Sequence, residues 1–254
     1  MESLLENHAG TFLSSMLAII TSGLFLTPTI LFFVRSGPLT TRFRTLIFRL
    51  ILSSLIFIYG VPLVFDKLSN RVILKEDAPL KNSNTLEIHN KIPFISDMHA
   101  DTLMWKYRES FLTGTNGHVT LPKMQASGMA LQTFAIVNSI PHTLNMKFNV
   151  NNTDIFPFLV VSQLYDFEAW FSPLGRAKSF SKLLHSFEAE SKGMFTVIKD
   201  QRTLNHFLKR RKSNRKMASG LLSVEGAQVL EYNLENVDTL FNLGVRMFGM
   251  LFFI

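Results

Sequence analysis

A charge-free stretch near the N-terminus limits what this chain can fold into more than any other feature. No Asp, Glu, Lys or Arg occurs from Phe12 to Val34. As an α-helix with a rise of about 1.5 Å per residue, it would be about 34 Å long, more than the roughly 30 Å hydrocarbon core of a bilayer. We therefore predict a membrane-spanning helix there. Glu2 and Glu6 stand where a signal peptide carries lysine or arginine, which argues against cleavage of this segment.

A second apolar run extends from Leu50 to Phe65 and reaches a spanning length only if Leu46 to Arg49 are included. It predicts a second membrane helix, with a buried core helix or a re-entrant segment as the alternative. Four arginines and no acidic residue occur from Arg35 to Arg49, which we expect to form a loop. Because positively charged loops stay in the cytoplasm, the N-terminus and everything after Phe65 should lie on the other side of the membrane.

Composition restricts the chemistry of the remaining residues. The chain has 254 residues, no cysteine and a net charge of +7. Without cysteine, disulfides and thiolate metal sites are excluded, and any metal must be held by histidines and carboxylates. More than half of the net charge comes from the four arginines between the apolar runs, so it does not indicate nucleic-acid binding.

Apolar segments that suit strands alternate with amphipathic segments in the second part of the chain. This alternation predicts an α/β fold with a parallel sheet and right-handed crossovers, and polar residues at strand ends favour a (β/α)8 barrel with its site at the carboxyl ends. About five of the eight strands are present. The predicted strands are Ile92–Met98, Met129–Val137, Met194–Lys199, Ser219–Gly226 and Val245–Phe253; the predicted helices are Lys106–Leu112, Phe158–Phe171, Gly175–Lys192, Gln201–Lys212, capped by Asp200, and Asn233–Leu243, stopped by Gly244.

Two polar side chains close the first of these strands. Side chains alternate along a strand, so His99 and Asp101 should point the same way and present an imidazole beside a carboxylate. Both are zinc ligands. The alternative is a polar turn that ends a buried strand. We predict His89, in the polar linker, to be solvated, and the other histidines, which have no partner at ligand spacing, to be structural or solvated: His8, His118, His142, His185 and His206. The basic run Lys209–Lys212 suits a solvated helix end, with binding to anionic lipid headgroups as the alternative.

Three motifs in order extend from Asp97 to Trp105 (DMHADTLMW), from Gly117 to Gln132, and from Leu222 to Met247 with Glu225–Gly226 near its start. Together they resemble the membrane dipeptidase (renal dipeptidase) family of two-zinc peptidases, specifically its bacterial, membrane-anchored branch. The resemblance covers roughly residues 92–249.

The resemblance implies roles for individual residues. His99 and Asp101 match the ligands of the first zinc, and Glu225 matches the catalytic carboxylate that bridges both zincs, which share a hydroxide that attacks the dipeptide. Asp97 would orient a ligand, or else form a strand-end turn. The implied cofactor is Zn²⁺, two ions in the family and at most a partial site here.

The sequence also departs from the family pattern. Thr120 stands where the family has Asp, and after Met250 the chain has Leu-Phe-Phe-Ile254 in place of Leu-Thr-His. The family then supplies two histidines for the second zinc and an aspartate for proton transfer, and all of these are missing. We therefore expect a truncated and inactive chain.

The sequence as a whole predicts a membrane-anchored zinc dipeptidase with an anchor at residues 1–65, a polar linker at 66–91 and an incomplete barrel at 92–254. Its partners would be a dipeptide and the lipid bilayer, with no nucleic acid. Its location would be the bacterial inner membrane, with the main domain outside the cytoplasm. Family members are often dimeric, but the sequence leaves the oligomeric state open. Two alternatives remain, a membrane-tethered interaction protein on a half barrel and another metal-dependent amidohydrolase.

Overall fold

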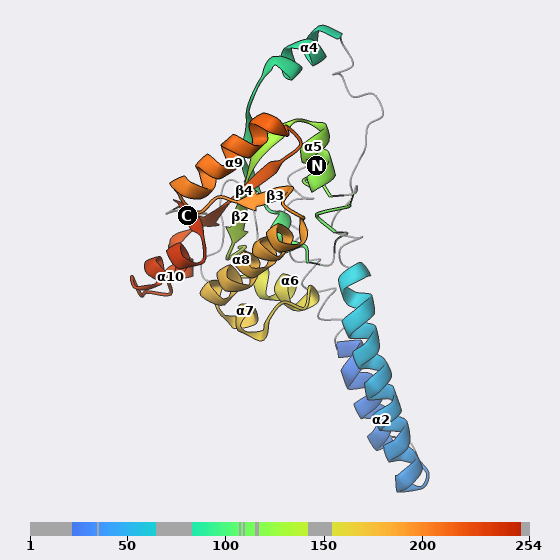
Figure 1. The fold of residues 1–254 in the computed structure, drawn as a ribbon. Helices are drawn as coiled ribbons and strands as arrows, with labels where there is room; N and C mark the ends of the chain where they lie inside the picture. Colours follow the sequence, from blue (N-terminus) through green and yellow to red (C-terminus); the bar gives the residue numbers. More distant parts are fainter. Residues whose placement is uncertain are drawn as a thin grey trace, which may run out of the picture. The chain divides into compact units, whose positions relative to one another are not determined.

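The computed structural model describes residues 22–34, 36–64, 83–106, 108, 110–114, 117–141 and 154–249 (Figure 1). The chain divides into two compact units. One comes from residues 1–69 and 139–164, and the other from residues 70–138 and 165–252. The predicted span at Phe12–Val34 is helical over Ser22–Val34, and its first part lies outside the described residues.

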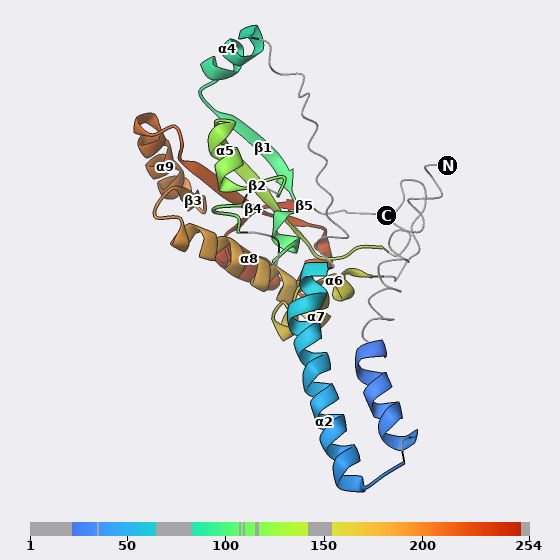
Figure 2. The same ribbon diagram turned by 90° about the vertical axis from the view of Figure 1, so that its right-hand side faces the viewer.

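The first unit contains a pair of antiparallel helices, Ser22–Val34 and α2 (Leu39–Leu55) (Figure 2). They are held together by a hydrogen bond of 2.6 Å from Ser53 Oγ to Leu24 O and by the edge-to-face rings of Phe25 and Phe57. This unit also contains α6 (Phe156–Ser162).

The predicted loop from Arg35 to Arg49 is wrong for most of its length. Helix α2 begins at Leu39, so three of the four arginines lie on the helix, and residues 36–38 are the described part of the connection. Gly37, at a φ of +133°, and Pro38, the N-cap, make this connection. No helix-breaking residue follows until Gly60 and Pro62, and a π-helical turn over Ile56–Gly60 directly precedes this proline.

The helical segment Leu39–Val64 is 26 residues long. Large apolar side chains are exposed along it, among them Phe48, Ile51, Leu55 and Tyr59. A surface helix of a water-soluble domain would show a polar face instead. Within the described part of the chain, this is the one helix that is long and apolar enough to cross a membrane.

A parallel sheet forms the centre of the second unit, which confirms the predicted α/β fold. Its strands are β1 (Ile95–Ala100), β2 (Met129–Val137), β3 (Phe195–Val197), β4 (Ala218–Glu225) and β5 (Val245–Gly249). The order is β1-β2-β4, and the other edge of β4 pairs first with β3 and then with β5. The sheet is consistent with part of a barrel, and its parallel strands bring all carboxyl ends to one edge.

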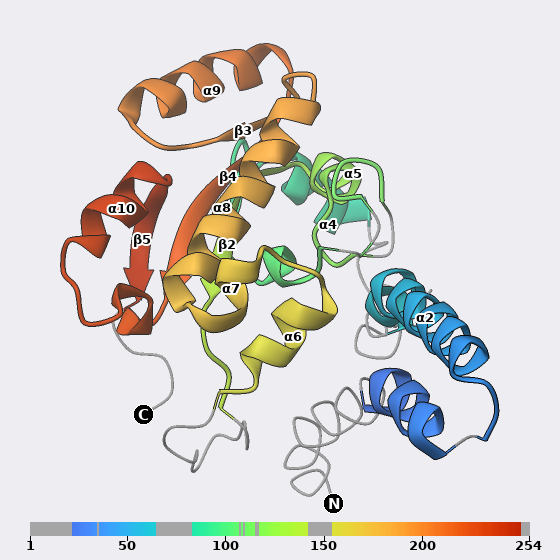
Figure 3. The ribbon, with the colours of Figure 1, turned by 90° about the horizontal axis from the view of Figure 1, so that it is seen from below.

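Helices flank these strands, and several differ from prediction. They are α4 (Ser83–Lys91), α5 (Leu121–Ala126), α7 (Phe167–Phe171), α8 (Pro173–Glu190), α9 (Gln201–Ser213) and α10 (Asn236–Asn242), with 3-10 turns at Thr102–Met104 and Ala227–Leu230 (Figure 3). Helix α4 lies inside the predicted linker. The single helix predicted from Phe158 to Phe171 is wrong, because the chain turns at Leu164, whose φ is +47°.

The predicted helix Lys106–Leu112 is also wrong, since its described residues form turns. The Ser110 hydroxyl accepts a hydrogen bond from Leu112 N at 3.2 Å, and Gly114 N donates to Ser110 O at 2.7 Å. A serine hydroxyl that bonds to the nearby backbone competes with helix formation.

Local signals at helix ends are confirmed. Asp200 begins α9 through a capping box with Thr203, and Gly244 ends α10 at a φ of +99°. Thr120 is the N-cap of α5, where its hydroxyl accepts a bond from Lys123 N. A threonine in place of aspartate therefore still caps this helix.

Aromatic side chains pack where β2, β3 and β4 meet. The rings of Phe111, Phe134 and Phe195 contact one another edge to face, with centroids 5.1–5.9 Å apart. Gly220 of β4 leaves room for them, because a Cβ at this position would lie 2.7 Å from Phe195 Cζ. This close packing fixes β4, whose last residue is Glu225.

Candidate metal centre

His99 and Asp101 come together, although not by strand alternation alone. His99 lies in β1, whereas Asp101 lies beyond the strand, at a φ of −88° and a ψ of 28°, where it begins the 3-10 turn Thr102–Met104. The turn brings the carboxylate back toward the imidazole, and His99 Nε2 is 3.1 Å from Asp101 Oδ1. The predicted proximity is therefore observed, but a turn at the strand end produces it.

Glu225 meets the same imidazole from another strand. It ends β4, two strands away from β1, and its Oε1 lies 2.6 Å from His99 Nε2. One ligand atom from each of the three residues lies within 4.8 Å of the other two. The structure thus brings together all three residues that the sequence singled out as metal ligands.

The environment of Glu225 differs from that of the other two residues. Its side chain is 10% exposed, against 53% for His99 and 45% for Asp101. Burial, and then the negative charge of Asp101, raise the pKa of Glu225 to about 7, while His99 acts in the opposite direction. A nearby cation would relieve this electrostatic cost.

The three residues fit a zinc ion. Glu225 Oε1 is buried and forms no hydrogen bond of normal geometry among the described residues, and it lies 2.6 Å from His99 Nε2, which also lies 3.1 Å from Asp101 Oδ1. Two carboxylates thus share one imidazole nitrogen, and a cation would compensate the negative charge that this nitrogen cannot. One imidazole nitrogen and two carboxylate oxygens are zinc ligands. Over the described residues, no other group of three His, Cys, Asp or Glu side chains converges in this way.

Backbone contacts hold Glu225 in place. Asn138 follows β2 directly, and its Nδ2 donates to the carbonyls of Glu225 and Gly226. The Asn138 carbonyl in turn accepts a hydrogen bond from Arg176 of α8, a buried arginine that also bonds to Ala169 O at 3.0 Å. Sequence reasoning missed Asn138 and Arg176. The one available signal was an asparagine directly after a buried parallel strand.

Asp97 and two of the remaining histidines, His89 and His185, have structural contacts. Asp97 Oδ1 accepts a hydrogen bond from the backbone N of His99 at 3.1 Å, so it contacts a ligand residue through the main chain. His185 Nε2 lies 3.2 Å from Leu243 O, and His89 Nε2 lies 2.6 Å from Ser127 O, where the sequence predicted a solvated side chain. His118 and His206 are exposed, and His8 and His142 lie outside the described residues.

Solved structures that are similar to this chain include two metallopeptidases. One is dipeptidase AC, a metallopeptidase of family M19, at 20% identity and a TM-score of 0.44, covering 62% of this chain and 42% of that one. The other is a metallopeptidase from Rhodobacter sphaeroides liganded with a phosphinate mimic of the dipeptide L-Ala-D-Ala, at 18% identity and a TM-score of 0.45, covering 62% of this chain and 45% of that one.

The chain therefore spans less than half the length of either structure. No protein-family profile and no curated protein matches the sequence. Both solved structures are metallopeptidases, and the first is a dipeptidase, the class that the sequence motifs resemble. Because both TM-scores are below 0.5, the function of this chain must be argued from its own site.

Proposed function

We propose that residues 92–249 form a zinc-binding domain of the dipeptidase type, in which His99, Asp101 and Glu225 hold the metal. The observation that carries this proposal is the convergence of three ligand atoms within 4.8 Å from the ends of two different strands. The cluster also includes a carboxylate that is only 10% exposed and that shares one imidazole nitrogen with a second carboxylate.

Each residue has a separate task in this proposal. His99 offers Nε2, Asp101 adds an exposed carboxylate, and Glu225 gives up the proton that its raised pKa retains near neutral pH. Asn138 holds the backbone of Glu225, so the carboxylate keeps its direction. Zinc, when bound, supplies a Lewis acid that polarises a peptide carbonyl and activates water for hydrolysis.

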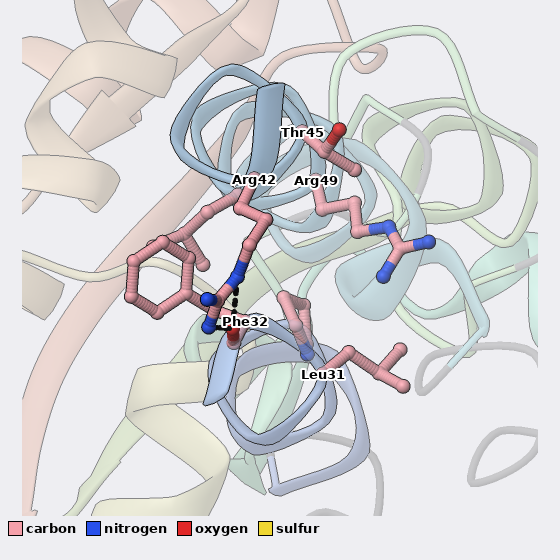
Figure 4. A pocket seen from close by; sticks show the side chains of 7 residues that line it. Leu31, Phe32, Arg42, Thr45 and Arg49 are labelled. Atoms are coloured by element: carbon pink, nitrogen blue, oxygen red, sulfur yellow. Dashed lines mark hydrogen bonds between the residues drawn. The ribbon is translucent and has the colours of Figure 1, made fainter. Parts of the chain in front are cut away.

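The proposed substrate class is dipeptides, and the proposed location is a membrane. Leu39–Val64 would span the bilayer, and Arg42, Arg44 and Arg49 in the first part of this segment would place that end in the cytoplasm of a bacterial cell. The domain that follows would then lie outside the cytoplasm. Arg42 is held at this end of the helix pair, where its Nε donates to Phe32 O at 3.0 Å and its guanidinium lies over the Phe32 ring (Figure 4).

The test is zinc binding by the full chain in detergent, measured by competition with a chromogenic chelator. We expect one zinc per chain, because one group of three ligands converges in the described part of the protein. His99→Ala and Glu225→Gln should each weaken zinc binding by about 100-fold or more. This is a larger loss than is typical when only a residue that supports a metal ligand is replaced. His206→Ala, which changes an exposed histidine of α9, is the matched control and should leave zinc binding unchanged.

Activity is measured on the same preparations with a panel of dipeptides. Two-metal hydrolysis needs ligands for a second ion, and over the described residues a single group of three ligands converges, so we expect zinc binding without measurable turnover. Turnover that Glu225→Gln abolishes would support the dipeptidase assignment and contradict the expected inactivity. Zinc binding that survives both ligand substitutions would contradict the proposed metal centre.

A further inference from the structure

The second unit has a basic groove at the opposite end of the sheet from the metal centre. Lys209, Arg211 and Lys212 of α9 line it together with Arg215, and Phe94 and Leu208 add apolar surface. No acidic side chain is among the residues that line this groove.

Hydrogen bonds place the groove at the amino ends of the strands. Arg211 donates to the carbonyls of Gly128 and Met217, which directly precede β2 and β4. Arg215 donates to Ile92 O at 2.7 Å, just before β1. Because the strands are parallel, these contacts all lie at one edge, and His99 and Glu225 lie at the other.

The positive charge of the groove is not neutralised by the protein. None of the four cations forms an ion pair with a carboxylate among the residues that the structure describes. Arg211 is only 4% exposed, and its Nε has no hydrogen-bond partner. Burial, and then the charge of Arg215, lower the pKa of Arg211. An anion in the groove would therefore gain attraction without displacing an acidic side chain.

The chain itself connects this end of the domain to the apolar helix. Val64 ends the segment that is long enough to span a membrane, and Pro93 and Phe94 of the groove follow it by about 30 residues. A stretch of that length spans at most about 100 Å even when fully extended, which sets an upper limit on the distance between the groove and a bilayer that holds the helix. Phe94 is 37% exposed and could contact the lipid interface.

We propose that the basic groove binds the phosphate groups of anionic phospholipids. Lys209 and Lys212 provide exposed charge, Arg211 and Arg215 provide charge fixed to the backbone, and Phe94 and Leu208 contact the glycerol and acyl region. Such binding would orient the metal centre away from the bilayer. The inference rests on the membrane location proposed above but not on zinc binding, which the same samples can report separately.

The experiment uses the full chain, which has no cysteine and so accepts a single label. Asn205→Cys places a fluorophore in the groove, and Glu235→Cys places one at the start of α10, near the carboxyl ends of the strands. Each labelled chain is reconstituted in vesicles of phosphatidylcholine alone, or with one third phosphatidylglycerol, both carrying a headgroup quencher. We expect strong quenching at position 205 in the anionic vesicles only, and weak quenching at position 235 in both.

Charge variants test the groove directly. Lys209→Gln with Lys212→Gln should weaken the anionic-lipid response by about 10-fold or more, since each cation near an anionic surface contributes attraction. Lys178→Gln with Lys182→Gln is the control, with the same loss of charge on α8, where both lysines are paired with acids. About 1 M salt should abolish the response, because it shortens the screening length to about 3 Å.

Several outcomes would overturn the inference. Quenching at position 205 that is equally strong in neutral and anionic vesicles would contradict it. So would an equal loss of the anionic-lipid response in the two double-lysine variants, or stronger quenching at position 235 than at position 205. Soluble poly-glutamate that changes the fluorescence at position 205 as strongly as anionic vesicles do would assign the groove to an acidic protein partner instead. If the Lys209→Gln, Lys212→Gln variant keeps its zinc affinity, then the result for lipid binding by the groove is independent of the metal centre.

Discussion

The two ends of the sheet carry charged side chains of opposite sign. These side chains differ in the hydrogen bonds and ion pairs that they form. At the carboxyl end, Asp101 and Glu225 face a single imidazole, and one carboxylate oxygen has no hydrogen bond. At the amino end, the guanidinium of Arg211 donates to three backbone carbonyls through its two terminal nitrogens, and only its Nε has no hydrogen bond. Burial of a charged group therefore does not by itself indicate a ligand-binding site. Arg211 is fixed to the scaffold by its backbone bonds, whereas Asp101 and Glu225 share a single imidazole nitrogen, an arrangement that a cation would complete.

The largest expected effect is at the scaffold end. Arg211→Met should lower the free energy of unfolding by about 3–4 kcal/mol, because the carbonyls of Gly128, Arg215 and Met217 lose their donor. Urea unfolding of the full chain in detergent, followed by tryptophan fluorescence, measures it, since Trp105 and Trp170 both lie in the second unit. Lys212→Met, at an exposed neighbour, should stay within about 0.5 kcal/mol of the wild type. If both substitutions lower the free energy of unfolding equally, Arg211 does not stabilise the amino end of the sheet through its backbone bonds.

The second prediction concerns the pH dependence of the metal-free chain. Between pH 4.5, the ordinary pKa, and about 7, folded Glu225 keeps a proton that the unfolded chain releases. Folding therefore takes up a proton, and the stability contributed by this group falls as pH rises through that interval, by about 2–3 kcal/mol. Glu225→Gln should not show this fall, and the difference between the two unfolding curves at pH 5 and pH 8 measures it. Parallel pH profiles would show that Glu225 is not under electrostatic strain.

The smallest expected effect is on the support of the metal centre. Asn138→Leu removes the donor to the carbonyls of Glu225 and Gly226, so the zinc dissociation constant should rise about 10-fold. Asn242→Leu, at an exposed position of α10, is the matched control. Chelator competition measures the affinity, and circular dichroism confirms the fold of both variants. Unchanged affinity in a folded Asn138→Leu protein would exclude a positioning role.

Local patterns of the sequence predicted the elements that local physics controls. Apolar runs located β2 and β4 to within a residue, the capping box at Asp200 located the start of α9, and Gly244 located the end of α10. Predictions failed where one residue redirects the chain. The φ of Leu164 breaks a predicted helix, and the hydroxyl of Ser110 replaces another with turns. Neither effect appears in hydrophobic periodicity.

The sequence by itself determined the chemical inventory of this protein: a charge-free N-terminal run, no cysteine, and a histidine and two carboxylates at strand ends. Only the tertiary structure decided that Glu225 of β4 meets His99 of β1 at 2.6 Å, and that Arg211, in a run predicted to be solvated, is buried against the opposite end of the sheet. The physical reason is that helix caps and strand periodicity act over a few residues. Strand order and the burial of a charge depend on which distant backbone atoms the fold brings into contact.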